Sequence, residues 1–112
     1  MNNYRIHERH GIKVVTFEQG RFDAKFVNDI KEDMLVDILS QDSVIFNLTK
    51  VNFIDSSALG FMVSIFRHVD SRFSVCGCIP AVMAVLELTR LVKIFPVYDS
   101  VEIALFGGSN EE

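Results

Sequence analysis

Residues 44–60 read VIFNLTKVNFIDSSALG and contain the two signals that decide the fold. The first part, Val44–Leu48, is short, mostly apolar and rich in strand formers, which is typical of a buried strand. The last part places Asp55, Ser56 and Ser57 at the start of an apolar helical pattern that ends near Val69. A buried strand followed shortly by a helix predicts an α/β fold with a parallel sheet.

The residues before this stretch predict a hairpin and a helix. Tyr4–Glu8 and Ile12–Glu18 are strand-like runs separated by a short turn that contains Gly11. A break then supplies Asp23 as the N-cap of a helix that runs to about Leu39. The core face of that helix consists of residues spaced three and four apart, namely Val27, Ile30, Met34 and Ile38.

The residues after the stretch continue the alternation of strands and helices. We expect a strand at Arg72–Cys76, a helix from Pro80 to Leu88, an edge strand at Ile94–Val97 and a helix at Ser100–Phe106. Alternating elements of this kind form parallel sheets through right-handed crossovers. The prediction is therefore a mixed, mostly parallel sheet of about five strands with four helices and an N-terminal hairpin.

Length, composition and charge exclude several classes of protein. The chain has 112 residues, 49% of them hydrophobic, so we expect one domain over residues 1–106 and a polar tail over 107–112. A net charge of −4 without a basic stripe argues against direct nucleic-acid binding. The lack of a long apolar run argues against membrane insertion and a signal peptide, so a cytoplasmic location is expected.

The cysteines and histidines do not form a recognisable chemical motif. Cys76 and Cys78 are too close in sequence for an ordinary disulfide and are expected to be reduced packing residues. His7, His10 and His68 lack the short pair spacing of a metal site. No metal and no other cofactor is therefore expected.

The segment Asp55-Ser56-Ser57 is the chemical centre of the sequence. A helix N-terminus offers unpaired amide protons and a partial positive charge, which suit a carboxylate, a hydroxyl or a phosphate. Capping by Asp55 or Ser56 would by itself account for these residue types. A nucleophilic serine of the G-x-S-x-G type is disfavoured because Ile54 occupies the first glycine position, and no phosphate-binding loop motif occurs. Neither motif therefore supports a catalytic role for this segment.

The helix that follows this segment is apolar on two faces. One face carries an ordinary core stripe of Leu59, Met62, Val63 and Phe66. The other carries Ala58, Phe61 and Ile65. Because a small domain buries both faces of a helix with difficulty, we expect Phe61 and Ile65 to contact a partner protein. Two alternatives stay open, namely that a neighbouring helix covers this face or that it forms a homodimer.

Nearly the whole chain resembles the STAS domain family. Residues 45–60 resemble its signature, in which a strand and a short loop precede Asp-Ser-Ser/Thr-Gly-Leu-Gly and a helix, although Ala58 stands where glycine is frequent. Gly20-Arg21-Phe22-Asp23 resembles the family's Gly-x-Leu-Asp element. Residues 75–82 and 88–91 are similar to the strand, helix and turn near its C-terminus. The resemblance implies a STAS-type sandwich.

The resemblance also implies a function, that of a bacterial anti-sigma-factor antagonist. In such proteins an anti-sigma factor that is itself a serine kinase phosphorylates the serine after the aspartate, here Ser56, and a cognate phosphatase reverses the reaction. The unphosphorylated form binds the kinase and the phosphorylated form releases it. The resemblance thus implies that the protein is a substrate and a switch, and not an enzyme. Asp23, Asp55, Ser57 and Ala58 would then join Phe61 and Ile65 in the partner-binding surface. Phosphorylation next to Asp55 would add about 1.5 to 2 negative charges and weaken binding.

Two other functions remain open at this point. The first is a structural STAS subunit of a signalling scaffold, or of a transporter or lipid-trafficking complex, which would need no phosphorylation. The second is a nucleotide-binding module, which rests on the resemblance alone because the chain has no phosphate-binding motif.

Overall fold

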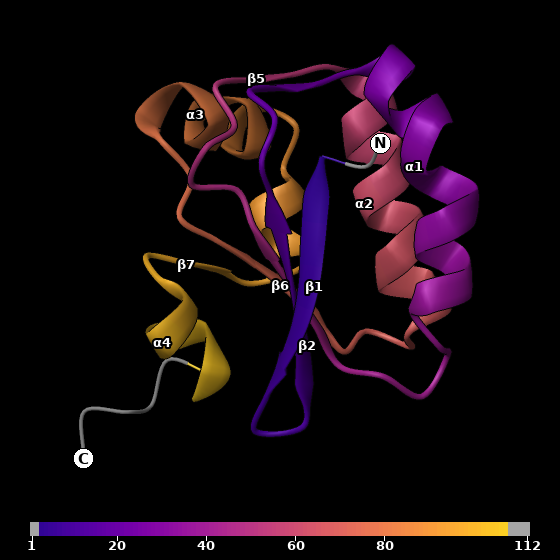
Figure 1. The fold of residues 1–112 in the computed structure, drawn as a ribbon. Coiled ribbons are helices and arrows are strands. Elements are labelled where there is room, and N and C mark those ends of the chain that lie inside the picture. Colours follow the sequence, from indigo (N-terminus) through magenta and orange to yellow (C-terminus); the bar gives the residue numbers. More distant parts are fainter. Residues whose placement is uncertain (1–2, 108–112) are drawn as a thin grey trace.

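The computed structural model describes residues 3–107 and places five strands in one sheet (Figure 1). The strand order is β1-β2-β4-β6-β7, in which β1 and β2 are antiparallel and the other neighbours are parallel. The bounds are β1 Tyr4–Arg9, β2 Ile12–Phe17, β4 Val44–Asn47, β6 Phe73–Cys76 and β7 Val97–Tyr98. Two short strands, β3 (Arg21–Phe22) and β5 (Phe53–Ile54), form a separate parallel pair. The predicted mixed, mostly parallel sheet is confirmed.

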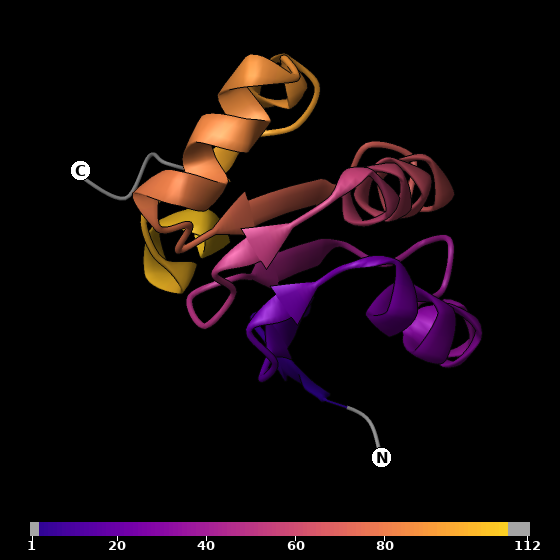
Figure 2. The same ribbon diagram turned by 90° about the horizontal axis from the view of Figure 1, so that it is seen from above.

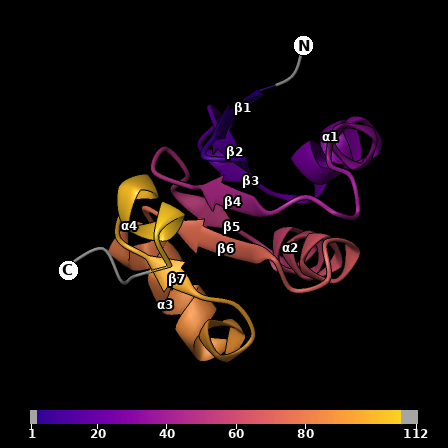
Figure 3. The ribbon, with the colours of Figure 1, turned by 90° about the horizontal axis from the view of Figure 1, so that it is seen from below.

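Helices lie on both faces of the sheet (Figures 2 and 3). α1 (Ala24–Asp37) and α2 (Ser56–His68) lie side by side on one face, and the short α4 (Val101–Leu105) lies on the other. α3 (Pro80–Leu88) and the 3-10 helix η1 (Leu91–Lys93) flank the β7 edge. The α-helices within residues 3–107 number four, as the sequence predicts.

The N-terminal hairpin is confirmed, and its turn explains its shape. β1 and β2 pair up to Arg9 opposite Ile12, which leaves only two residues in the turn. Those residues, His10 and Gly11, have φ angles of 54° and 77°. Two consecutive positive φ angles are the pattern of a type I′ turn, whose twist matches that of antiparallel strands.

The central strand β4 separates two apolar clusters. Val44 and Phe46 belong to the cluster under α1 and α2, whereas Ile45 belongs to the cluster under α4. All three side chains are at most 2% exposed, which confirms the predicted buried strand. Phenylalanine rings with centroids 4.8 to 6.5 Å apart fill much of the larger cluster, namely Phe17, Phe22, Phe26, Phe46, Phe61 and Phe73.

α1 follows its sequence pattern closely. The helix ends at Asp37, and the next residue, Ile38, still donates its amide proton to the Met34 carbonyl. The predicted core stripe is buried throughout, with Val27, Ile30, Met34 and Ile38 all at or below 9% exposure. The 3.6-residue period therefore predicted the buried face of this helix correctly.

The last strand lies later in the chain than the sequence suggested. Instead of Ile94–Val97 it comprises Val97–Tyr98, although it does lie at the sheet edge as predicted. The reason is the turn before it, where Arg90 adopts a φ of 65° and leads into η1. Phe95 is buried against the core instead of extending the strand. The bonds to the neighbouring segment begin at the Pro96 carbonyl, which accepts from the Val75 amide, and continue at the Tyr98 carbonyl, which accepts from the Gly77 amide.

The C-terminal ends of β4 and β6 are held together closely. The Leu48 amide donates to the Cys76 carbonyl at 2.9 Å. Gly77, the next residue, has a φ of 77°, and a Cβ atom there would lie 2.4 Å from the Thr49 hydroxyl oxygen. Only glycine combines this conformation with this close approach. The loop that leads to β5 is therefore fixed at its start.

Two sequence predictions concern the chain ends and the membrane. Of the predicted polar tail, residues 107–112, all but Gly107 lie outside the described residues. Among the helices of residues 3–107, none has the length and apolar character needed to cross a bilayer.

Candidate functional site

The β3–β5 pair brings the N-termini of α1 and α2 together. Its register places Arg21 opposite Phe53 and Phe22 opposite Ile54. Each strand is followed by an aspartate, Asp23 or Asp55, which caps the helix that begins one residue later. Both aspartates are extended, with φ and ψ of −130° and −176° at Asp23 and −122° and −174° at Asp55. Two residues predicted from separate parts of the sequence are thus brought to one site.

Asp23 caps α1 and also binds a neighbouring cation. Its Oδ1 accepts the Phe26 amide proton at 3.1 Å, and its Oδ2 accepts a bond from Arg21 Nε at 3.2 Å. The bond from the Phe26 amide, aided by Arg21, lowers the pKa of Asp23 below its ordinary value of 3.8. The predicted N-cap is confirmed, and the carboxylate is ionised at neutral pH.

Asp55 joins the two helices. Its Oδ1 accepts the Ala58 amide proton of α2 at 3.1 Å, whereas its Oδ2 accepts the Ala24 amide proton of α1 at 3.0 Å. Each helix start has unpaired amide groups, and one carboxylate here satisfies one group from each helix. The sequence predicted a cap by Asp55 or Ser56, and the structure assigns it to Asp55.

Ser56 is left exposed because Asp55 performs the capping. It is the first residue of α2, and its hydroxyl forms no hydrogen bond within residues 3–107. Ser57, the next residue, is half-buried. The two adjacent serines therefore differ in accessibility. The Ser56 hydroxyl is free to react or to bind a partner without the loss of any bond in the described part of the chain.

The predicted partner contacts of α2 were wrong for three residues. Ala58 and Ile65 are 0% exposed and Phe61 is 6% exposed, so all three belong to the core. The reason is that α1 lies beside α2 and covers this face together with the sheet (Figure 1). The alternative of coverage by a neighbouring helix is correct, and the proposed basis for a homodimer through this face is removed.

The outward face of α2 is different from the one expected. Its exposed residues recur at helical spacing and are small or polar, namely Ser56, Gly60, Ser64 and Arg67. Of the expected core stripe, Met62 is fully buried, whereas Leu59, Val63 and Phe66 are half-buried against the core. The exposed face of α2 that includes Ser56 therefore carries mainly small and polar residues.

Arg21 and Phe53 also belong to the site and were not predicted. The Arg21 guanidinium carbon lies 4.0 Å from the centroid of the Phe53 ring, which is 39% exposed. Phe22 and Ile54, the alternate residues of the two strands, are buried, so Arg21 and Phe53 point outward together. The only sequence signal for this contact was Phe53, a large apolar residue two positions before Asp55. The contact itself depends on the pairing of β3 with β5, which joins distant parts of the sequence.

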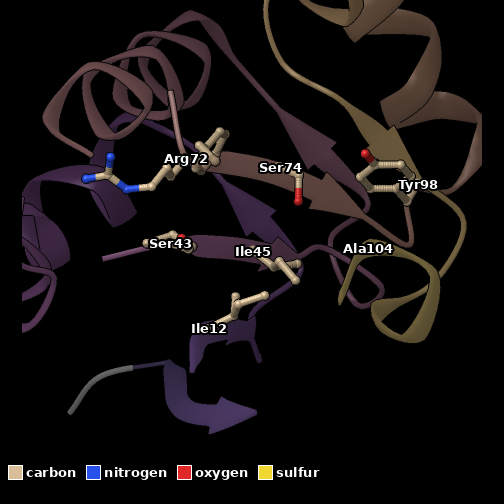
Figure 4. Close-up of a pocket in the computed structure, with 9 residues that line it drawn as sticks. Ile12, Ser43, Ile45, Arg72, Ser74, Tyr98 and Ala104 are labelled. Carbon is tan, nitrogen blue, oxygen red and sulfur yellow. The ribbon is translucent and has the colours of Figure 1, made fainter. Parts of the chain in front are cut away.

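A shallow recess on the opposite face of the sheet is separate from this site. Its volume is about 140 Å³, and Arg72 lies at one end and Tyr98 at the other, with Ser74 between them (Figure 4). Arg72 is already bonded to the Ser40 and Asp42 carbonyls. The predicted site residues do not line this recess, so the structure gives it no connection with Ser56.

The remaining reactive side chains are accounted for by packing. Cys76 and Cys78 are free thiols, and burial raises their pKa values to about 12 and about 11. Both thiols are therefore protonated at neutral pH and weakly nucleophilic. The His68 ring is hydrogen-bonded to the Ile38 carbonyl at 2.8 Å. Within residues 3–107, His, Cys, Asp and Glu side chains form no group of three that could hold a metal ion.

The lowered pKa of Asp23 predicts an acid-sensitive contribution to stability. A carboxyl whose pKa is lower in the folded state stabilises the fold fully above its unfolded value, 3.8, and loses this effect as the pH falls through the folded value. Asp23→Asn keeps an acceptor for the cap but cannot ionise. Thermal unfolding between pH 5 and about pH 2 should show a shallower decline for this variant than for the wild type. Equal declines in the two proteins would contradict a lowered pKa of Asp23 in the folded state.

Comparisons with known proteins agree on one family. A family profile described as STAS domain matches residues 3–104. An anti-sigma F factor antagonist from Paenibacillus polymyxa is 30% identical over 62 residues, which cover 53% of this chain and 53% of that protein. The match therefore spans about half the length of this relative.

Solved structures share the fold. A STAS domain protein from Planctomyces limnophilus, described as an anti-sigma-factor antagonist, has a TM-score of 0.86 at 21% identity and covers 97% of this chain and 99% of its own. The phosphorylated form of the Bacillus cell fate determinant SpoIIAA has a TM-score of 0.67 at 17% identity, with coverages of 92% and 96%. A sulfate transporter family protein from Wolinella succinogenes has a TM-score of 0.72 at 15% identity, with coverages of 89% and 86%. At these identities the likeness concerns the fold alone.

Proposed function

Because this chain belongs to the STAS domain family, we propose that it is an anti-sigma-factor antagonist switched by phosphorylation of Ser56. The unphosphorylated protein binds an anti-sigma factor that is also a serine kinase, and phosphorylation releases it. A cognate phosphatase restores the binding form. In this role the protein is the substrate of a kinase and an interaction module, and it catalyses no reaction itself.

The observation that carries this proposal is the position of the Ser56 hydroxyl. It is exposed in the first turn of α2 and forms no hydrogen bond within residues 3–107, because the preceding residue, Asp55, supplies the N-cap. A kinase can therefore reach it without unfolding the helix. The curated relative from Paenibacillus polymyxa, which is named as an antagonist, supports the same role.

The chemistry of the switch follows from this position. The Ser56 Oγ atom attacks the γ-phosphorus of ATP, so that an Oγ–P bond forms while the bond to the bridging oxygen breaks and ADP leaves. A base of the kinase takes the hydroxyl proton. The product carries about 1.5 to 2 negative charges at pH 7, next to Asp55. The N-terminus of α2 stabilises this charge within the domain, while a partner surface that accepted a hydroxyl is repelled.

Phosphate mapping tests the proposal. The wild-type protein is incubated with ATP and, in turn, with each serine-kinase anti-sigma factor of its own organism, and the phosphate is located by mass spectrometry. We expect one phosphate on Ser56, none on Ser56→Ala and normal incorporation on the matched control Ser57→Ala, because Ser57 is half-buried. Incorporation at another residue, or none with any such kinase, would count against the switch.

A structural role is the second candidate function. The observation in its favour is the shared fold with a sulfate transporter family protein. In this role the chain would be a subunit of a scaffold or of a transporter complex, and phosphorylation would be unnecessary. Ser56→Asp separates the two candidates. If the protein is a switch, the Ser56→Asp variant should no longer bind the anti-sigma factor. If the protein is a structural subunit, the other subunits should co-purify with Ser56→Asp as well as with the wild type.

A further inference from the structure

Arg21 offers hydrogen-bond donors that are unused within residues 3–107, on the strand pair that leads into α1 and α2. Its Nε atom donates to Asp23, but its two terminal amino groups form no hydrogen bond within the part of the chain that the structure describes. The side chain is 62% exposed and lies against the Phe53 ring, so its planar group is held in place on the surface. A guanidinium with free terminal donors is well suited to bind a phosphoryl group through two parallel bonds.

The β3–β5 pair directs this guanidinium toward the helix N-termini. Arg21 reaches forward along the strand to Asp23, which lies beside Asp55 in the continued register. The bond from the Ala24 amide to Asp55 shows that α1 begins next to the cap of α2. Ser56 is the residue immediately after that cap. A phosphoryl group on Ser56 would thus lie next to Asp55, whose neighbour Asp23 already binds Arg21.

The neighbouring lysines are less suited to this role. Lys25, in the first turn of α1, is paired with Asp29 at 3.6 Å, and Lys50 is paired with Glu18 at 2.7 Å. Asp23 does not depend on Arg21 for its helix cap, since the bond from Phe26 uses its other oxygen. A doubly charged phosphoryl group would compete with Asp23 for the guanidinium, because it carries more charge and has three acceptor oxygens.

From these contacts we propose that Arg21 is a phosphate ligand that binds the phosphoryl group of phosphorylated Ser56 within the same chain. Phe53 positions the guanidinium for this contact. The inference rests on the proposed function, in which Ser56 is phosphorylated. In the phosphorylated protein, Arg21 then neutralises part of the charge of the phosphoryl group and holds this group against the surface formed by β3 and β5. The phosphorylated protein is thereby more stable than one in which the phosphoryl group moves freely.

The test measures the phosphoryl group directly. Phosphoserine is inserted at position 56 during translation by an expanded genetic code, and its second pKa, ordinarily about 6, is measured by ³¹P NMR at low salt. Arg21→Ala is expected to raise this pKa by about half a unit, because an exposed cation favours the dianion. Arg21→Lys keeps a positive charge and should therefore raise the phosphoserine pKa less than Arg21→Ala does. In the matched control Lys25→Ala, the phosphoserine pKa should equal that of the protein with Arg21 and Lys25 intact.

The outcomes distinguish the inference from the proposed function. An Arg21→Ala protein with an unchanged phosphoserine pKa would overturn the inference, and so would an equal rise in Lys25→Ala, which would indicate a general effect of nearby charge. Because no kinase is needed, the measurement remains valid even if no kinase modifies Ser56. A failure of every kinase to modify Ser56 would contradict only the proposed function.

Discussion

Phe61→Ala is expected to lower the free energy of unfolding by about 3 to 5 kcal/mol, because it removes a buried ring and leaves a cavity. Phe61 is 6% exposed, and its ring lies 6.3 Å from that of Phe22 and 6.4 Å from that of Phe46. These neighbours belong to the sheet and to β3 and cannot move to fill the space without breaking their own packing. Urea denaturation gives the change directly.

The matched control is Phe53→Ala, which truncates the same residue type at an exposed position. Phe53 is 39% exposed and contacts Arg21, so its loss should cost no more than about 1 kcal/mol. Similar losses for the two variants would contradict the assignment of Phe61 to the core. A well-folded Phe61→Ala protein that lost only partner binding would restore the idea that this residue contacts a partner.

Asp55→Ala is expected to lower the free energy of unfolding by about 2 to 3 kcal/mol, since two backbone amides lose their acceptor together. One loss is the N-cap of α2 at Ala58, and the other is the bond to Ala24 of α1. Because the second bond joins two helices, the variant should also loosen the contact between their N-termini. Hydrogen exchange at the Ala24 amide should therefore become faster.

Asp55→Asn separates the two contributions of this side chain. Asparagine has one carbonyl oxygen and can still cap α2, but its amino group cannot accept the bond from Ala24. We expect a loss of about 1 kcal/mol and the same faster exchange at Ala24. Asp23→Ala removes a cap without a bond between helices and should leave that exchange unchanged. If Asp55→Asn were as unstable as Asp55→Ala, the role of Asp55 in joining the helices would be wrong.

These contacts explain how a switch at Ser56 could act without refolding the domain. The caps of both helices are supplied by Asp23 and Asp55, so modification of Ser56 removes no hydrogen bond of the described chain. The added charge lies on the exposed edge of α2, while the residues beneath it form a tightly packed core. In the function proposed above, the added charge would therefore weaken partner binding while the fold of the domain stays intact.

Local patterns in the sequence predicted most of the fold. Helix α1, its buried stripe and its Asp23 cap depend on bonds and periodicities within a few residues, and all are confirmed. For α2 the sequence left the cap open between Asp55 and Ser56. The buried strand Val44–Leu48 was recognisable because its short apolar run is characteristic of a central parallel strand. Such signals are local, so the amino-acid sequence by itself indicated the main strands and helices. It placed the start of α2 only to within a residue, near Ser56 and Ser57, and it did not predict the short strands β3 and β5.

Only the tertiary structure decided what surrounds that serine. The bond between Ala24 and Asp55 joins residues 31 positions apart, and the Arg21–Phe53 contact needs the same β3–β5 pairing. Periodicity showed that α2 is apolar on two faces, but it could not show which neighbour covers each one. The position of α1 buries Phe61 and Ile65 and leaves Ser56 exposed, because long-range packing depends on how the whole chain is connected and not on the residues of one helix.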